Sequence, residues 1–466
     1  MKKLFALIIL SLAIVACEKE DSMRESKKNQ ESLYNMDSSI FLSEQKALEK
    51  VVSQMNLFNG SVGTKSKHYG VRSVDIINPP TKSDINSPLY LFNFDNAEGF
   101  ALISADKRDE NTIYLLSTEG NLDSKLLTDK SSPYNFLYEC VNQYQRSVIS
   151  QYREPLLTKG AEDEELVITR SVAYQRGPYL TTKWEQGNPF NQILRERLQI
   201  SSTSGDCNVG CTPLAIGQIF NCVARRKGLI TIVRGSEMFN MNYVRQIKNF
   251  ADAEDDLNYV DSNGNSGLRI REVSKLLYHI GQAVGTTYSY DSTITAYVGS
   301  TPPGNNVLSG IRSFGLTCSG FREYSINAVK NALDSCAVLA NGWPGDGSMG
   351  HTWVIDGYKE ILDEYRTYDG NGNLIENTVA IDYNRDITTT YFHCNFGWDK
   401  GEANGDYKIS QIFEVEGWPT RTYFYSDIFR DTNRSMADNT VDMRSFAYPT
   451  VEVITDIGYP LKTKYE

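Results

Sequence analysis

A cysteine at the start of a predicted helix is the residue in this sequence best suited to nucleophilic chemistry. Cys211 follows Val209-Gly210, and Thr212-Pro213 begins a helical pattern behind it, because proline is tolerated in a first helical turn. A thiol in this position faces the positive end of the helix dipole, which favours the reactive thiolate. The sequence therefore predicts a nucleophile at Cys211, and the alternative is a buried structural cysteine.

A thiolate nucleophile works with a base, and histidine, the usual partner, occurs only four times in the chain. His351 follows a glycine and opens a strand-like run, which leaves its ring accessible. His393 lies in a second strand-like run and shares a face with Asn395, since side chains alternate along a strand. Local sequence thus offers two candidate partners for Cys211, namely His351 and His393.

Four segments, taken together, resemble the streptopain family of bacterial cysteine peptidases, which belongs to the papain-like clan. In chain order they are residues 185–191 (EQGNPFN), 210–219 (GCTPLAIGQI), 350–358 (GHTWVIDGY) and 393–398 (HCNFGW). The spacing agrees, because papain-like enzymes carry their histidine about 130–150 residues after the cysteine. Residues 99–108 (GFALISADKR) look like part of the inhibitory propeptide of the same family.

The resemblance implies that Cys211 is the nucleophile and that its partner is His351, because the family places the catalytic histidine in the Gly-His strand. It also implies that Gln186 supplies a side-chain amide to the oxyanion hole, so that two donors hold the developing charge. No cofactor and no metal are required for this chemistry.

In the family pattern, an asparagine and a tryptophan accompany the histidine. These positions correspond here to Asn395, which would orient the imidazole, and Trp398, which would shield it from water. The chain departs from the pattern at Phe396, where a tryptophan is more usual, so the cleft wall is expected to differ there.

The first residues predict export and a lipid anchor. Lys2 and Lys3 precede an apolar run, Leu4 to Ala16, that is too short to span a bilayer. The run ends at Cys17 in a pattern that resembles the lipobox of bacterial lipoproteins, which implies cleavage before Cys17 and acylation of its thiol. We expect a signal peptide over 1–16 and a solvated tether over 17–39; the alternative is a plain signal peptide with an incidental cysteine.

Two folded regions are expected after the tether. Residues 40–158 begin with a helical pattern after Ser43, continue with short strands over 89–117, and end with a helix near 134–152, as in a small α+β propeptide domain. An acidic stretch then predicts an exposed processing linker over 159–176, with Lys159 and Arg170 as candidate cleavage sites. Residues 177–466 form the expected peptidase domain.

The expected fold class is α+β throughout. In the peptidase domain, one helix follows Cys211, another begins near Leu268, and strand-like sequence starts at His351. This order predicts a papain-like domain, in which the helix that bears the nucleophile packs on an antiparallel sheet.

Composition and residue spacing bear on nucleic-acid binding, disulfide bonding and metal binding. A net charge of −11 argues against a nucleic-acid partner, which would need a basic face. Eight cysteines in 466 residues are too few for a disulfide scaffold, and without a CxxC pair a structural zinc site is not expected. The loop Asp261–Glu272 has oxygen-bearing side chains at calcium-loop spacing, but Ser266 stands where an EF-hand needs glycine, so a solvated loop and a calcium site are both open.

The function predicted from these patterns is that of a secreted cysteine endopeptidase made as a latent zymogen. Its expected partners are protein or peptide substrates, its own propeptide as an inhibitor, and a membrane reached through the lipid on Cys17. Two alternatives stay open, a thiol acyl-transfer enzyme such as an amidase or a transglutaminase-like protein, and a non-catalytic surface lipoprotein.

Overall fold

The computed structural model describes residues 40–60, 66–78, 87–109, 113–129, 133–151, 165–199, 207–288, 293–295, 305–334, 337–343, 351–378, 384–397, 421–425 and 450–454. The expected signal peptide and tether lie outside these ranges, as do Cys17, Lys159 and Trp398. Within the described ranges, no helix is both long enough and apolar enough to cross a bilayer.

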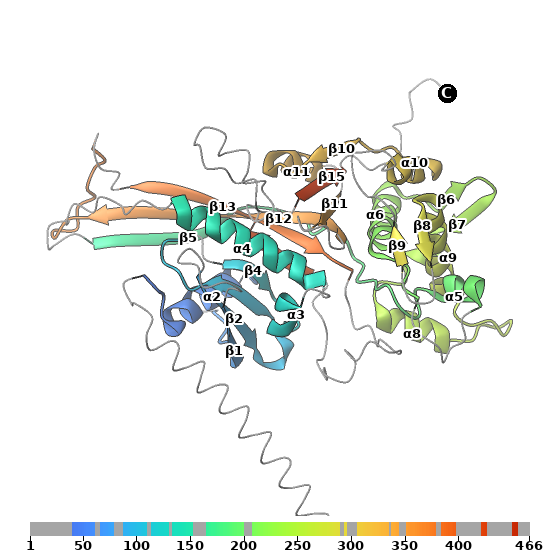
Figure 1. The fold of residues 1–466 in the computed structure, drawn as a ribbon, viewed down its shortest axis with the longest axis horizontal. Helices are drawn as coiled ribbons and strands as arrows, with labels where there is room; N and C mark the ends of the chain where they lie inside the picture. The colour runs from blue at the N-terminus through green and yellow to red at the C-terminus, as the bar shows by residue number, and fades with distance from the viewer. Residues whose placement is uncertain are drawn as a thin grey trace, which may run out of the picture.

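The leading region is an antiparallel sheet accompanied by helices, as the sequence predicts (Figure 1). Its strands pair in the order β1-β2-β3-β4. Helix α2 begins after Ser43 because the Ser43 hydroxyl accepts a hydrogen bond from the Lys46 backbone N–H, and it presents Val51 and Met55 to the core. The elements are α2 (Glu44–Phe58), β1 (Val71–Ile77), β2 (Leu89–Phe94), the 3-10 turn η2 (Asp95–Ala97), β3 (Phe100–Ser104), β4 (Ile113–Ser117), α3 (Ser124–Thr128) and α4 (Pro133–Gln151).

Helices dominate the region that contains Cys211, drawn in green and yellow in Figure 1. The two helices predicted at Cys211 and Leu268 begin at those residues, as α6 and α9. They pack closely at Gly217, where a Cβ atom would come within 2.5 Å of the Leu277 Cδ2 atom. The elements are α5 (Gln192–Leu198), α6 (Cys211–Lys227), β6 (Thr231–Arg234), β7 (Glu237–Asn240), α7 (Met241–Val244), α8 (Phe250–Asn258), α9 (Leu268–Ala283), β8 (Thr286–Tyr288), β9 (Thr293–Thr295) and α10 (Asn305–Ser313).

A large antiparallel sheet carries His351 and runs on into the leading region. Its strand order is β1-β2-β3-β4-β14-β13-β12-β11-β15-β10. Helix α6 packs against the face of the sheet that carries Leu339 and Val354. A helix that begins at Cys211 on an antiparallel sheet is the α+β arrangement expected of a papain-like domain. The remaining elements are β10 (Phe321–Glu323), α11 (Ile326–Leu333), β11 (Val338–Trp343), β12 (His351–Tyr368), β13 (Arg385–Asn395), β14 (Arg421–Tyr425) and β15 (Thr450–Ile454).

Part of the expected linker is a strand instead. Residues Glu165–Arg176 form β5, which pairs antiparallel with the outer half of β12, from Tyr358 to Tyr368. The Arg170 guanidinium binds the Asp363 carboxylate through two hydrogen bonds of 2.5 and 2.7 Å. A protease needs an accessible, unpaired chain, so this pairing makes Arg170 a poor processing site. The predicted exposed processing linker thus contains a β-strand over Glu165–Arg176, and cleavage near Lys159 stays a prediction.

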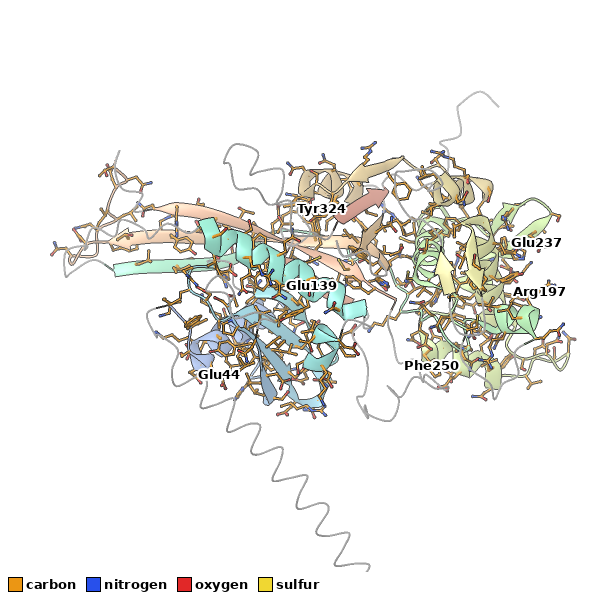
Figure 2. The ribbon with its side chains drawn as sticks, in the orientation of Figure 1. Glu44, Glu139, Arg197, Glu237, Phe250 and Tyr324 are labelled. Carbon is orange, nitrogen blue, oxygen red and sulfur yellow. The ribbon has the colours of Figure 1, made fainter. Side chains whose placement is uncertain are left out.

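One apolar core joins the leading region to the long strands. Leu102 and Tyr114 from the leading sheet belong to the same buried cluster as Trp353 and Phe392 from β12 and β13. Figure 2 draws the side chains of these elements as sticks, with Glu44 labelled on α2 and Glu139 on α4. The leading region is thus built into the sheet that carries His351, and a second core lies among the helices around α6.

Candidate active site

Cys211 is the first residue of α6, and the turn before it presents its thiol. Gly210, which precedes the helix, has a φ of 90°, a backbone conformation that glycine adopts without the steric cost of a side chain. The Cys211 side chain is half-buried, whereas the next thirteen residues of the helix are buried. Local sequence therefore places the thiol at the positive end of a helix that the core holds fixed.

His351 is the first residue of β12, and aromatic rings enclose its imidazole. Its ring stacks on Phe396, with centroids 5.8 Å apart and an interplanar angle of 17°, and lies parallel to Trp353 at 6.4 Å. The Nε2 atom lies 3.0 Å from the Phe396 carbonyl oxygen. Because a carbonyl only accepts, Nε2 carries the proton in this contact, which leaves Nδ1 to exchange a proton with a neighbouring group.

The thiol of Cys211 and the imidazole of His351 interact directly. Burial raises the pKa of the Cys211 thiol, but the charge and the hydrogen bond of His351 lower it, as do hydrogen bonds from the Thr352 backbone and the Thr212 side chain. The net effect lowers the pKa of Cys211 from 9.0 to about 7. A substantial fraction of the sulfur is therefore thiolate at neutral pH, which is the state that attacks carbonyl carbon.

Gln186 lies in a loop that is held beside the start of α6. The Val209 backbone N–H donates to the Gln186 carbonyl at 3.0 Å, and the buried Asn191 side chain donates to the Cys207 carbonyl at 2.8 Å. These two bonds join the loop to the residues just before Cys211. The Gln186 side chain is half-buried, and among the described residues no hydrogen bond engages its amide.

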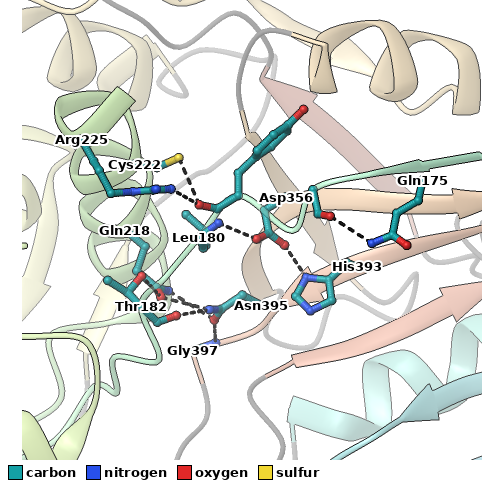
Figure 3. Close-up of polar contacts among 12 residues, drawn as sticks. Gln175, Leu180, Thr182, Gln218, Cys222, Arg225, Asp356, His393, Asn395 and Gly397 are labelled. Carbon is teal, nitrogen blue, oxygen red and sulfur yellow. Dashed lines mark hydrogen bonds and ion pairs between the residues drawn. The ribbon is translucent and has the colours of Figure 1, made fainter. Parts of the chain in front are cut away.

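Asn395 connects three elements rather than holding the imidazole. Its Nδ2 atom donates to the Thr182 carbonyl at 2.9 Å and to Gln218 Oε1 on α6 at 3.1 Å, and its Oδ1 atom accepts from the Gly397 backbone N–H at 3.0 Å (Figure 3). The family pattern predicts that Asn395 contacts His351. In the structure, the carbonyl of Phe396 makes this contact instead. Asn395 thus fixes the turn that carries Phe396.

His393 has a different partner from His351. Its Nδ1 atom lies 2.5 Å from Asp356 Oδ1, and the other oxygen of Asp356 accepts from the Leu180 backbone N–H at 2.7 Å (Figure 3). Both side chains of this pair are buried. The pair holds the chain near Leu180 against β12, and the histidine in contact with Cys211 is His351.

Two features of the site escaped the sequence reasoning. From the sequence, Phe396 stands out only as a departure from the family pattern, and its role as a hydrogen-bond acceptor is hidden because every residue type has a backbone carbonyl. The two threonines that follow Cys211 and His351, Thr212 and Thr352, belong to the sequence motifs, but the sequence assigned them no role. Their hydroxyl groups meet only because α6 lies on the start of β12.

In the loop Asp261–Glu272, which has calcium-loop spacing, the Asp261 carboxylate accepts hydrogen bonds from the loop itself. Asp261 Oδ1 accepts from the backbone N–H groups of Asn263 and Asn265, while Glu272 points elsewhere and accepts from the Asn240 N–H at 2.7 Å. Within the described ranges, no three His, Cys, Asp or Glu side chains cluster as metal ligands. The geometry at Asp261 is that of a solvated loop.

Residues 184–407 match the model of the Peptidase C10 family. Among solved structures, the chain is similar to a fragment of prointerpain A from Prevotella intermedia, with 16% identity and a TM-score of 0.43 over 83% of this chain and 99% of that one. A comparison with curated proteins gave no match. The matched range contains Cys211, His351 and Asn395, so the part of the chain that carries the candidate site matches the Peptidase C10 (streptopain) family of cysteine peptidases.

Proposed function

We propose that this chain is a secreted cysteine endopeptidase in which Cys211 and His351 form the catalytic pair. The observation that carries the proposal is the interaction between the two side chains, which lowers the pKa of the half-buried Cys211 thiol to about 7 although desolvation raises it. A merely structural cysteine in an apolar core shows the opposite, as Cys140 does, where burial raises the pKa.

The reaction would proceed through a covalent acyl-enzyme. The Cys211 thiolate attacks the peptide carbonyl carbon, and the carbonyl electrons move to its oxygen. When the C–N bond breaks, the His351 imidazolium gives its proton to the leaving amine. Water then attacks the thioester while His351 accepts a proton from it, and the C–S bond breaks to regenerate the thiolate.

Two donors would hold the oxyanion in this reaction, the Gln186 side-chain amide and the Cys211 backbone N–H. The bonds from Val209 and Asn191 support this role, because they keep the Gln186 loop beside the first turn of α6. Loss of one preorganised donor typically costs about 3–4 kcal/mol of transition-state stabilisation. Gln186→Glu, which removes the donor amide, should therefore reduce kcat by about 100-fold or more.

Latency is the second part of the proposal, with the leading region as the intramolecular inhibitor. Three contacts support it. The Lys183 ammonium group, three residues before Gln186, binds the Glu119 carboxylate at 2.5 Å. Lys359 on β12 donates to the Phe58 carbonyl at 2.7 Å, and β4 pairs with β14. Cleavage near Lys159 would break the covalent link between the two parts of the chain, and an uncleaved chain as active as the cleaved one would refute latency.

The third part is the location of the enzyme. We propose export and attachment to a bacterial membrane through lipid on Cys17, on the strength of the Lys2-Lys3 start and the apolar run before Cys17. Metabolic labelling with a fatty acid should mark the wild type and leave Cys17→Ser unlabelled. Equal labelling of both would rule out this anchor.

Cleavage of casein tests the catalytic proposal. The wild type, after processing, should release peptides, and Cys211→Ala and His351→Ala should not. Cys318→Ala is a matched control, because Cys318 is a half-buried cysteine whose pKa is raised by burial. Equal activity of wild type and Cys211→Ala would refute the peptidase mechanism. Release of ammonia or cross-linking of casein without peptide release would favour the acyl-transfer alternative, and inertness would favour the binding alternative.

A further inference from the structure

A buried pair of amide side chains connects the helix that begins at Cys211 to the end of β13 (Figure 3). Asn395 Nδ2 donates to Gln218 Oε1 on α6 at 3.1 Å, and Gln218 Nε2 donates back to Asn395 Oδ1 at 3.3 Å. The Thr182 hydroxyl also donates to Gln218 Oε1, at 2.9 Å. The three side chains are each 1% exposed, so water cannot replace a hydrogen bond that is lost among them.

Gln218 lies on the same face of α6 as the nucleophile. Seven residues make close to two turns of a helix, so Cys211 and Gln218 point in nearly the same direction, about 10 Å apart along the helix axis. Leu214 lies between them on this face and packs against Gly397, where a Cβ atom would not fit. This face of α6 therefore contacts the turn of residues 395–397 at two points, through Leu214 and through Gln218.

The same turn carries the acceptor for the imidazole. The Gly397 backbone N–H donates to Asn395 Oδ1 at 3.0 Å, which closes the turn around Phe396. The Phe396 carbonyl lies 3.0 Å from His351 Nε2. With two donors at its oxygen and two acceptors at its nitrogen, the Asn395 amide has no hydrogen bond left for His351. The amide pair therefore acts on the imidazole only through the position of the turn.

We propose that Gln218 is a positioning residue, which holds the Phe396 carbonyl in place and thereby orients the imidazole of His351. This inference rests on the catalytic roles of Cys211 and His351 proposed above. Because one rigid helix bears both Cys211 and Gln218, any shift of the helix moves the nucleophile together with the anchor of its partner. Without the Gln218 amide, the turn has room to move relative to the sulfur, and the imidazole moves with it.

A role in stability alone would have a different effect. It would lower the temperature of unfolding and leave the chemistry of the folded molecules unchanged. A positioning role lowers kcat while KM changes little, because the orientation of the imidazole matters in the transition state and not for the binding of substrate.

The first measurement is the kinetics of casein cleavage after processing. Gln218→Met keeps the length of the side chain and removes its hydrogen-bonding groups, so kcat should fall about 10- to 100-fold with KM within about twofold of the wild type. Asn221→Leu is the matched control, because Asn221 also lies on α6, is 1% exposed, and makes no hydrogen bond to residues 395–397. Its kcat should stay within about twofold of the wild type.

The second measurement is the alkylation of Cys211 by iodoacetamide in the full-length chain between pH 5 and pH 10, with the Cys211 peptide quantified by mass spectrometry. The wild type should show a midpoint near pH 7, since His351 lowers the pKa of the thiol. A displaced imidazole lowers that pKa less, so the midpoint should rise in Gln218→Met and stay in place in Asn221→Leu.

An unchanged alkylation midpoint in Gln218→Met would overturn the proposal, and so would an equal loss of kcat in Gln218→Met and Asn221→Leu. If Gln218→Met fails to fold, judged by its thermal unfolding, Gln218→Asn takes its place, because its shorter side chain keeps an amide but draws it away from Asn395. Alkylation does not require cleavage. A wild type that cleaves no casein, beside a raised midpoint in Gln218→Met, would therefore refute the peptidase proposal and leave the positioning role standing.

Discussion

At the scale of single residues, the reactivity of Cys211 reflects a competition between burial and its neighbours. Burial alone raises the pKa of the thiol, and His351 is the largest of the effects that lower it to about 7. In His351→Ala the lowering is lost while the burial stays. The pKa of Cys211 should therefore rise toward or above its ordinary value of 9.0.

Alkylation rates measure this shift. Because the pKa of the wild-type thiol is lowered to about 7, its rate should rise from pH 6 to pH 8 and then level off, whereas the rate of His351→Ala should still be rising at pH 9. Cys318, read from the same digest, serves as an internal control. Superimposable Cys211 profiles in the two proteins would show that His351 does not act on the sulfur.

Phe396 holds the imidazole with both its backbone and its ring. Phe396→Ala keeps the carbonyl that contacts Nε2 and removes the ring stacked on His351. Aromatic contacts of this kind contribute about 0.5–1.5 kcal/mol, so kcat/KM should fall about two- to tenfold. Phe396→Trp, which restores the usual residue of the family, should stay within about twofold of the wild type. Unimpaired peptide release by the alanine variant would mean that the carbonyl alone orients the ring.

At this scale, the sequence predicts the roles of side chains better than it predicts contacts made by the backbone. Cys211 and His351 are rare residue types in distinctive local settings, and the structure places them in contact. The acceptor for His351 is a carbonyl of Phe396, and every residue has one, so no sequence signal marks it. The network around Asn395 depends on Thr182 and Gln218, which the fold brings together from distant parts of the chain.

At the scale of elements, the close approach of the end of β5 to β12 depends on Gly357. A Cβ atom at Gly357 would lie 2.7 Å from the Arg176 carbonyl oxygen and 3.1 Å from Pro178 Cα, and neither backbone atom can rotate away. Gly357→Ala should therefore lower the free energy of unfolding by about 1–3 kcal/mol. Gly320→Ala is the matched control, because nothing lies within 4 Å of its new methyl group. Chemical denaturation of both variants provides the measurement, and equal midpoints would show that the end of β5 can shift away from β12 at little cost.

The elements that the sequence predicted well are those with local signals. Helix α2 has a capping serine and a 3.6-residue apolar period, and helices α6 and α9 begin at the predicted residues. Strand β5 was missed because an acidic run precedes it and its partner β12 lies almost two hundred residues further along the chain. Pairing over such a distance is a property of the folded sheet, which local periodicity does not encode.

At the scale of the whole molecule, a buried lysine links the leading region to β12. Lys359 donates to the Phe58 carbonyl at the end of α2, and burial lowers its pKa from 10.5 to about 8. Between these two pH values the unfolded chain holds a proton that the folded chain has lost, so stability attributable to this residue rises with pH. The wild type should therefore gain up to about 3 kcal/mol relative to Lys359→Met between pH 8 and pH 10.5.

Urea unfolding at several pH values gives this difference directly, because other titrating groups cancel between the two proteins. Lys46→Met removes an exposed lysine from α2 and should show a constant difference from the wild type. A constant difference for Lys359→Met as well would mean that Lys359 reaches water in the folded chain.

The pairing of β4 with β14 has a consequence for the order in which the molecule is assembled. Leu116 on β4 lies opposite Tyr423 on β14, so one edge of the leading sheet finds its neighbour only after nearly the whole polypeptide has been synthesised. Before β14 is available, the amide and carbonyl groups at the β4 edge lack hydrogen-bond partners. They can then pair with an exposed strand of another nascent chain. Folding should accordingly be slow and sensitive to crowding. A synthetic peptide with the sequence of residues 421–425 should bind the β4 edge of the folding intermediate and inhibit completion of the fold.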